Sequence, residues 1–281
     1  MVRKTNRKII TQVIYQTIQG DKILAQAISP ELKRFGLEAG LANYSASYAT
    51  GLLCARRLLT QLGLADMYKG VENVDGELFD VYEQNQVKEK RPFKAVLDVG
   101  LYRTTTGNKT FAAMKGAVDG GLYIPHNTKR FAGYHIVKIA AQTGKKGKVV
   151  EKGKKEGKFD PKELREHIFG VHIQKYMDKL KKENKQKYTS QFSQWDKTLT
   201  KAKVSNLEAL YKKVHSEIRK NPKFVKAERK GTPVRKVIKK EKLGVIYENS
   251  KKKWYRAKKI NKKQKLERVK IKIQKALKQK K

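Results

Sequence analysis

The chain has 281 residues and carries 67 Lys and Arg against 26 Asp and Glu, a formal net charge of +41 at pH 7. A charge of this size repels itself, so the composition predicts a polyanionic partner: RNA, DNA or an anionic membrane surface. The single cysteine, Cys54, excludes an intramolecular disulfide and favours a reducing compartment. The apolar stretches are far shorter than the roughly 20 residues that span a bilayer, so membrane insertion and secretion are not expected.

Two stretches near the start of the chain have the pattern of a β-hairpin. Residues 9–18 (IITQVIYQTI) alternate β-branched and polar side chains, which predicts a strand. Residues 19–22 (QGDK) are typical of a turn, and residues 23–28 predict the returning strand. Further along, residues 94–99 (KAVLDV) form a nearly continuous apolar run that ends at Gly100. That pattern predicts a strand that is buried on both faces.

Two helices are predicted in the same half of the chain. Residues 43–62 repeat apolar side chains at steps of three and four, and Gly63 is a suitable C-terminal stop. Residues 110–118 predict a second helix that closes at Asp119-Gly120-Gly121. Strands that alternate with helices predict an α/β fold with a mixed sheet and packed helices. The apolar face of the first helix would hold Tyr44, Tyr48, Leu52, Ala55, Leu59 and Leu62, and the opposite face Asn43, Ser47, Thr50, Arg57 and Gln61.

The composition changes in the second half of the chain. Residues 144–158 hold 13 Gly, Lys and Glu among 15 residues, which predicts an unstructured linker. Asp160 and Pro161 then supply an N-cap and a first-turn proline, and residues 205–208 (SNLE) form a capping box, so helices are predicted as far as Asn221. We expect four regions: an α/β RNA-binding core over residues 1–135, a basic Gly/Lys linker over 136–159, a helical extension over 160–221 and a Lys-rich tail over 222–281.

The tail carries 25 Lys and Arg against 4 Glu. Because of this self-repulsion and its few apolar residues, we expect the tail to be disordered alone and ordered on RNA. Trp254 and Tyr255 precede Arg256, and aromatic rings among cations can stack on unpaired bases while the cations hold phosphates. Residues 260–281 space apolar side chains as a helix does, which favours a helix that forms on RNA or an amphipathic helix at a membrane surface.

Residues 107–110 (GNKT) are a partial match to a phosphate-binding loop. The nucleotide-hydrolysing pattern requires Gly-Lys followed by Ser or Thr, and Asn108 interrupts it. The favoured interpretation is that backbone amides, threonine hydroxyls, Arg103 and Lys109 hold RNA phosphates. A plain surface turn is the alternative.

Candidate catalytic residues lack partners in the sequence pattern. A metal-dependent nuclease would need a second and third acid beside Asp98, so Asp98 is expected to be a structural hydrogen-bond acceptor. His167 and His172 are five apart, whereas zinc ligands on a helix prefer a spacing of four. His126 is expected to make a polar contact with RNA or backbone. The chain is not predicted to be an enzyme, and we expect no cofactor and no metal.

Several motifs occur together in one known family. They are Thr5-Asn6-Arg7, Gly40-Leu41-Ala42-Asn43-Tyr44, Ala49-Thr50-Gly51-Leu52-Leu53, Ala55-Arg56-Arg57, Leu97-Asp98-Val99-Gly100-Leu101, Arg103-Thr104-Thr105-Thr106-Gly107, Lys115-Gly116-Ala117, Asp119-Gly120-Gly121-Leu122, Ile124-Pro125-His126, Lys129-Arg130-Phe131 and Gly133-Tyr134. On these residues the chain resembles the eukaryotic and archaeal 5S-rRNA-binding protein of the large ribosomal subunit, the family of universal large-subunit protein eighteen, called protein five in eukaryotes.

The resemblance implies an α/β core with helical C-terminal extensions. Its implied partners are 5S rRNA, large-subunit rRNA, a neighbouring 5S-binding ribosomal protein and ribosome assembly factors, with no membrane and no small-molecule substrate. The protein would help form the central protuberance, in cytoplasmic ribosomes and, during assembly, in the nucleus and nucleolus. The alternative is a basic RNA-binding assembly or export factor that acts off the mature ribosome.

The family's basic strand-one signature falls on residues 4–7 of this chain. Three differences from the family are the lack of its basic N-terminal extension ahead of this signature, Ala132 in place of a frequent proline, and the lysine-rich linker and tail. The candidate RNA-binding residues are Arg3, Lys4, Thr5, Asn6, Arg7, Arg56, Arg57, Arg103, Thr104, Thr105, Thr106, Asn108, Lys109, His126, Lys129, Arg130, Trp254, Tyr255 and Arg256.

Overall fold

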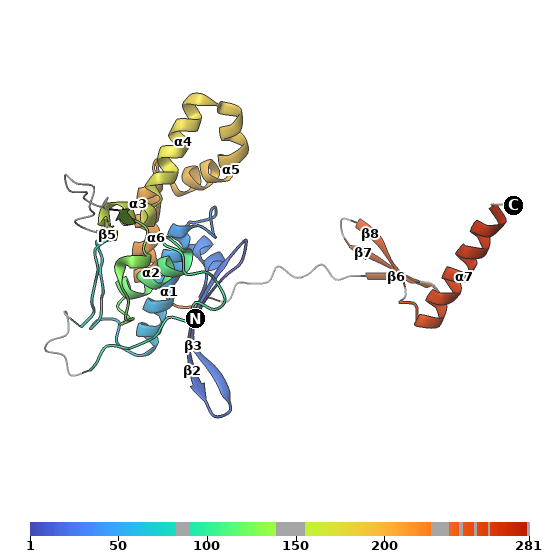
Figure 1. Ribbon diagram of the computed structural model, residues 1–281, viewed down its shortest axis with the longest axis horizontal. Coiled ribbons are helices and arrows are strands. Elements are labelled where there is room, and N and C mark those ends of the chain that lie inside the picture. Colours follow the sequence, from blue (N-terminus) through green and yellow to red (C-terminus); the bar gives the residue numbers. More distant parts are fainter. Residues whose placement is uncertain are drawn as a thin grey trace, which may run out of the picture. The chain divides into compact units, whose positions relative to one another are not determined.

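The computed structural model describes residues 1–82, 90–138, 155–225, 236–241, 244–249, 252–257 and 259–279. The chain divides into two compact units, Met1–Phe224 and Val225–Lys281. The first unit combines a three-stranded sheet with packed helices, which confirms the α/β class. Figure 1 shows the hairpin of β2 (Ile9–Thr17) and β3 (Gly20–Ile28) extending beyond the helices of this unit.

The sheet is antiparallel in the order β1–β2–β3, where β1 is Val2–Lys4. The hairpin that the alternating pattern predicts is confirmed, although the strands pair as far as Thr17 opposite Gly20, inside the predicted turn. The register shifts between Val13 and Ile14. A 3₁₀ helix, η1 (Ser29–Phe35), follows the hairpin, and the next helix, α1 (Tyr44–Gln61), packs on η1, β2 and β3.

The central helix, α1 (Tyr44–Gln61), begins and ends as predicted. Asn43 caps it by accepting a hydrogen bond from the Ala46 N–H (2.7 Å), and Gly63 follows in the left-handed region. The face of α1 that is polar in sequence does not lie at the surface, because Ser47 and Thr50 are fully buried. Strands of the sheet and several helices all pack against α1. The two hydroxyls fit this environment because each donates to a carbonyl one turn earlier in the same helix.

The second helix, α2 (Lys109–Asp119), crosses α1 at a very short distance. A Cβ atom at Gly51 of α1 would lie 1.9 Å from the carbonyl oxygen of Ala113, and a Cβ at Gly116 of α2 would lie 2.1 Å from that of Tyr48. Each helix therefore has a glycine where the backbone of the other passes. A side chain at either position would force the helices apart.

A buried ionic network joins α1 to the end of α2. The Lys115 Nζ donates to Asp119 Oδ1 (2.6 Å) and to the Glu77 carbonyl (2.7 Å), and the Tyr48 hydroxyl donates to Asp119 Oδ2 (2.6 Å). Burial raises the pKa of the Asp119 carboxyl, while the Lys115 ammonium opposes that rise. The carboxylate and the ammonium depend on each other, since neither has access to water.

Residues 94–99 are not the fully buried strand that their apolar run predicts. In the described part of the chain their pairing is a single parallel bridge from Lys94 to Tyr123. Half-buried and exposed side chains alternate along the segment, and Val96 is 79% exposed. Only one face of this extended segment lies against the core, and the apolar composition of the other face misled the prediction.

Part of the predicted linker is ordered. β4 (Tyr134–Lys138) pairs antiparallel with β5 (Lys155–Phe159), so the linker prediction is wrong for residues 155–158. A sequence rich in Gly and Lys can form this ladder because the hydrogen bonds are made by the backbone. Residues 144–154 of the predicted linker lie outside the described residues.

The helical extension holds α3 (Pro161–Phe169), α4 (Val171–Glu183), α5 (Lys185–Ala202) and α6 (Leu207–Lys220). Asp160 caps α3 by accepting from the Lys162 N–H, as predicted, and α6 ends at Lys220 with Asn221 as its C-cap. The capping box of α6 is not formed, because the Asn206 side chain makes no cap hydrogen bond. The sequence pattern missed α5. Figure 1 shows α4 and α5 as a pair that projects from the rest of this unit.

His215 of α6 lies among aromatic rings in the core of the first unit. Its ring centroid is 5.1 Å from that of Tyr48 and 5.7 Å from that of Phe169. Burial lowers the pKa of His215 from 6.5 to about 3, and the positive charge of Arg219 adds to the effect. The imidazole is therefore neutral in the folded chain at physiological pH.

Replacing His215 by Phe should change the acid dependence of stability. Because the folded pKa is lowered, the unfolded chain binds more protons below about pH 6.5, and His215 costs increasing stability as the pH falls toward 3. The difference in free energy of unfolding between wild type and His215→Phe should change by up to about 1.4 kcal/mol per pH unit between about pH 6 and 4. Urea unfolding at several pH values measures it. A constant difference would contradict the neutral buried ring.

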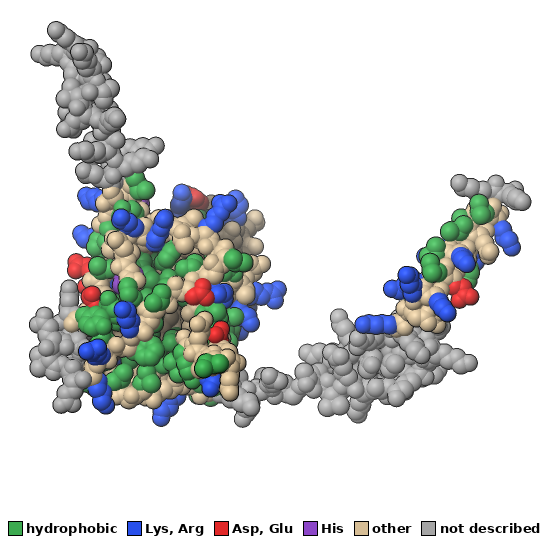
Figure 2. Space-filling model, turned by 60° about the horizontal axis from the view of Figure 1, so that its bottom comes forward, with side chains coloured by type: hydrophobic (Ala, Val, Ile, Leu, Met, Phe, Trp, Pro, Cys, Tyr) green, Lys and Arg blue, Asp and Glu red, His purple; other side chains and the backbone are tan. Residues whose placement is uncertain are grey.

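The second unit contains β6 (Lys236–Glu241), β7 (Gly244–Asn249) and β8 (Lys252–Ala257), antiparallel in that order, and then α7 (Lys262–Gln279). The helix predicted within residues 260–281 is confirmed. Figure 2 shows hydrophobic side chains along α7 among its Lys and Arg. None of the helices in the described ranges combines the length and the apolar character that a membrane crossing demands. The tail thus has secondary structure, and its ordering by rRNA stays a prediction.

Candidate RNA interface

The turn between β1 and β2 presents polar side chains to solvent. Thr5 shapes this turn, because its N–H donates to the Lys8 carbonyl (2.8 Å) and its Oγ1 accepts from the Lys8 N–H (3.0 Å). Asn6, Arg7 and Lys8 are exposed. Sequence analysis missed Lys8, although its position beside Arg7 in a basic turn was the available signal.

The side chains of Arg3 and Lys4 hold neighbouring loops. Arg3 Nη2 donates to Asp98 Oδ2 (2.6 Å), and the Gly100 N–H donates to Asp98 Oδ1 (2.8 Å). These two bonds lower the pKa of Asp98, and they confirm it as a structural acceptor. Lys4 Nζ donates to Asn108 Oδ1 (2.9 Å), which links the turn of residues 5–8 to the loop that precedes α2.

The loop of residues 103–109 surrounds the N-terminus of α2. Asn108 is buried and fixes the loop: its Oδ1 accepts from the Thr110 N–H (3.3 Å), and its Nδ2 donates to the Arg103 carbonyl (2.7 Å). Arg103, Thr104, Thr105, Thr106 and Lys109 are exposed. Hydroxyls and cations therefore stand around the positive end of a helix dipole, where anions are favoured.

A third segment completes this surface. The 3₁₀ helix η3 (Thr128–Arg130) lies beside the loop, because the Gly107 N–H donates to the Arg130 carbonyl (3.0 Å) and the Thr106 hydroxyl to the Lys129 carbonyl (3.4 Å). Lys129 and Arg130 are exposed. We call residues 5–8, 103–109 and 128–130 together the basic face.

The charges of the basic face are available to a ligand. Among the residues that the structure describes, no ion pair includes Arg103, Lys109, Lys129 or Arg130. Other Lys and Arg side chains are scattered over the surface of this unit, as Figure 2 shows for one side. What distinguishes the basic face is that its cations stand beside exposed threonine hydroxyls on hydrogen-bonded loops.

Arg56 and Arg57 do not reach the surface as the RNA prediction requires. They are 8% and 3% exposed. Arg56 donates to the carbonyls of Tyr68 (2.7 Å) and Ala65 (2.9 Å), while Arg57 pairs with Glu31 (2.7 Å). The Arg57 guanidinium and both terminal nitrogens of Arg56 bind groups of the chain itself, while the buried Nε of Arg56 has no partner among the described residues. The structure gives them roles in the core in place of the predicted RNA contact.

His126 and the three tail residues predicted to bind RNA lie outside the basic face. His126 Nδ1 lies 2.7 Å from the Ile124 carbonyl, which is the backbone contact among the two predicted alternatives. Burial lowers the pKa of His126. Trp254, Tyr255 and Arg256 belong to β8 and pair with β7, and they lie in the second unit. Their contact with RNA stays a prediction.

The described residues do not form the arrangement of side chains that a metal-dependent nuclease or a zinc site requires. In the described part of the chain, no three His, Cys, Asp or Glu side chains converge as metal ligands would. The rings of His167 and His172 contact each other with centroids 4.2 Å apart and planes tilted by 41°. Asn108, which interrupts the phosphate-loop pattern, serves as a helix cap.

Comparison with known proteins places the chain in the class of structural proteins of the large ribosomal subunit. Residues 1–127 match the family described as "Ribosomal large subunit proteins 60S L5, and 50S L18", and residues 207–278 match the "Ribosomal L18 C-terminal region". This class is a component of the ribosome and not an enzyme, which agrees with the sequence analysis.

Relatives over most of the chain define the family. The large ribosomal subunit protein uL18 of Tetrahymena thermophila is 48% identical over 82% of this chain and 71% of its own length. Those of Eimeria tenella and Suberites domuncula are 42% and 43% identical over 98% and 97% of this chain, and 80% of their own length. The chain belongs to the uL18 family, as the sequence motifs indicated.

Proposed function

We propose that this protein binds 5S rRNA through the basic face and helps form the central protuberance of the large subunit. The observation that carries the proposal is the meeting of three segments distant in sequence. Hydrogen bonds from Lys4 to Asn108 and from Gly107 to Arg130 join them. The loop and turn motifs that resemble the 5S-rRNA-binding family lie on this same surface.

The chemistry of the basic face suits a folded RNA. Arg103, Lys109, Lys129 and Arg130 can meet phosphate oxygens. Thr104 and Thr105 can donate to phosphates, and Thr106, whose hydroxyl donates to Lys129, can still accept from 2′-hydroxyls. Phosphate contacts supply affinity that falls with salt. Selectivity for 5S rRNA comes from the spacing of the three segments, which only an RNA of matching shape can contact at once.

The proposal extends to further partners. The hairpin extends beyond the helices of the first unit and exposes Tyr15 and Ile23 on its two faces and Ile18 at its turn. This supports contact with the neighbouring 5S-binding ribosomal protein. Large-subunit rRNA would meet the remaining cations, and assembly factors would accompany the protein through the nucleus and nucleolus to cytoplasmic ribosomes.

Selective binding is the direct test. The full chain should bind 5S rRNA at least about tenfold more tightly than an unrelated RNA of equal length, a difference of about 1.4 kcal/mol. Competition should be measured at about 150 mM salt, because lower ionic strength exaggerates non-selective charge effects. Equal affinity for the two RNAs would refute the proposal.

Removing the second unit should change the salt dependence more than the selectivity. A chain that ends at Phe224 keeps the Pro222 carbonyl that accepts from Arg57 (3.0 Å) and the Phe224 ring beside Arg57, so the first unit should stay folded. The log–log salt slope of binding should fall by about 0.7–0.9 for each RNA phosphate that the shortened chain no longer neutralises. Preference for 5S rRNA should survive. An unchanged slope would show that the tail does not touch RNA.

A further inference from the structure

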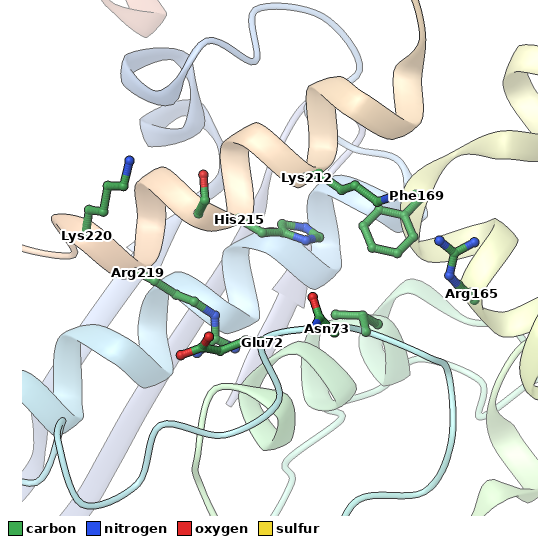
Figure 3. A pocket seen from close by; sticks show the side chains of 10 residues that line it. Glu72, Asn73, Arg165, Phe169, Lys212, His215, Arg219 and Lys220 are labelled. Atoms are coloured by element: carbon green, nitrogen blue, oxygen red, sulfur yellow. The ribbon is translucent and has the colours of Figure 1, made fainter.

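A pocket of about 610 Å³ lies between α3, α6 and the loop around Asn73, and none of its lining residues belongs to the basic face. Figure 3 shows α6 along one side with His215 and Lys212, α3 at one end with Phe169 and Arg165, and the loop opposite. Its volume falls within the roughly 300–1,000 Å³ of ligand sites. The pocket also uses no residue that sequence analysis selected for RNA contact.

A buried nitrogen in the inner wall of the pocket lacks a hydrogen-bond partner among the described residues. His215 Nε2 is buried and finds no partner among the described residues, and the residue is only 7% exposed. In Figure 3 its ring stands beside Phe169 and faces the loop that carries Asn73. A neutral imidazole offers one donor and one acceptor. A ligand that supplies the missing partner would relieve the cost of leaving this nitrogen unpaired.

The mouth of the pocket adds neutral polar groups and two cations that lie over a buried aromatic ring. Asn73 and Ser216 are exposed at its edge. The guanidinium carbon of Arg165 lies 5.0 Å from the centroid of Phe169, and Lys212 Nζ lies 5.7 Å from it. The ring itself is only 3% exposed, so these two cations, and not the ring, are the groups that a ligand would meet.

The charge balance of the pocket matches one phosphodiester. Its lining includes Arg165, Lys212, Arg219, Lys220 and the single acid Glu72. Two nearby acids pair with these cations, Glu208 with Arg165 and Lys212, and Glu217 with Lys220. Four positive charges against three negative ones leave a net charge of +1.

We propose that this pocket holds one unstacked nucleotide of the bound RNA. The base would lie against the Arg165 guanidinium with its edge toward His215 and Asn73, and its phosphate beside Lys212. Base edges present donors and acceptors together, as the neutral groups of the pocket do, whereas the carboxylates of an acidic peptide only accept and would use the donors of the pocket alone. The inference rests on the proposed RNA-binding function and adds a contact on the helical extension.

Nucleotide binding can be observed at His215 itself. In the full chain, selectively labelled at its five histidines, AMP, GMP, CMP and UMP are titrated in separate samples to above about 1 mM, the range of a weak single-site ligand. At least one should shift the His215 ring resonance saturably, while inorganic phosphate should not. A shift with tetraglutamate peptide and with no nucleotide would overturn the proposal in favour of a protein partner. No shift with any of these ligands would also overturn it.

A variant with a blocked pocket tests whether the pocket holds a nucleotide of bound RNA or only a free nucleotide. Ser216→Trp places a large side chain at the exposed mouth, and Ser190→Trp, on the exposed surface of α5, is the matched control. Ser216→Trp should abolish the His215 shift and weaken 5S rRNA binding about 5- to 150-fold, the value of one stacked base. Unchanged RNA affinity, together with disappearance of the nucleotide shift, would overturn RNA as the occupant.

A second variant guards against indirect effects of the tryptophan. His215→Phe keeps an aromatic ring in place but removes the nitrogens, and it should weaken 5S rRNA binding in the same direction as Ser216→Trp. An affinity equal to that of wild type would overturn the role of the base edge. Failure of the proposed function is distinguishable, because it appears as equal affinity of the wild-type chain for 5S and control RNA whatever the His215 resonance does.

Discussion

Replacing Arg103 and Lys109 together by Ala should weaken 5S rRNA binding by about 10²- to 10⁴-fold, since each charge-assisted contact with phosphate is worth roughly 1.5–3 kcal/mol gross. The thermal midpoint should not change. Both side chains are exposed and take no part in the ion pairs of the described chain, and the Asn108 bond uses the backbone carbonyl of Arg103, which the variant keeps. Affinity at fixed salt and thermal unfolding measure the two effects.

The matched control removes the same charge elsewhere. Lys182 of α4 and Lys187 of α5 are exposed and lie outside the basic face, so Lys182→Ala with Lys187→Ala tests the influence of net charge alone. This control should bind 5S rRNA nearly as well as wild type. Equal losses in the two double variants would mean that RNA senses the total charge and not the loop. A lower thermal midpoint with unchanged affinity would make the loop structural.

Asp119→Ala should lower the free energy of unfolding by about 3–5 kcal/mol, because it leaves a buried ammonium without its counter-ion. Lys115 would keep only the Glu77 carbonyl, and the Tyr48 hydroxyl would lose its acceptor. Urea unfolding measures the loss. Lys179→Ala breaks an exposed pair of the same i,i+4 spacing, with Glu183 (3.7 Å), and should cost at most about 0.5 kcal/mol.

A double variant that removes both buried charges distinguishes the cost of an unpaired charge from the cost of lost packing. Replacing Lys115 by Met and Asp119 by Leu removes both charges and leaves apolar side chains of similar size, so the double variant should be more stable than Asp119→Ala. If the double variant is the less stable of the two, the network contributes through its hydrogen bonds more than through mutual neutralisation of the charges.

The parts of the fold that follow from local pattern were predictable. The alternation of residues 9–18 specifies the hairpin, Asn43 and Asp160 specify helix starts, and Gly63 specifies a helix end, because each acts on its immediate neighbours. Burial is different, since it depends on what packs against a residue. Thr50 sits on a face that is polar in sequence but covered by other elements, and Val96 is apolar but uncovered.

The candidate site shows the same division. The motifs of residues 5–7 and 103–107 point to the correct family, and the structure brings them together with residues 128–130. The sequence could not show that Arg57 turns inward to Glu31, since an arginine on a helix looks the same in either role. The His215 pocket also escapes a sequence pattern, because three separated segments build it.

The contact between α1 and α2 has a consequence for the rate of recognition. With Gly51 and Gly116 each against the backbone of the other helix, α2 cannot roll or slide without a clash. The loop that ends at Asn108 is mounted on the first turn of α2. The conformational entropy of this loop is therefore lost when the chain folds and not when RNA arrives. Association should then be limited by encounter and orientation, with no slow ordering step at the basic face.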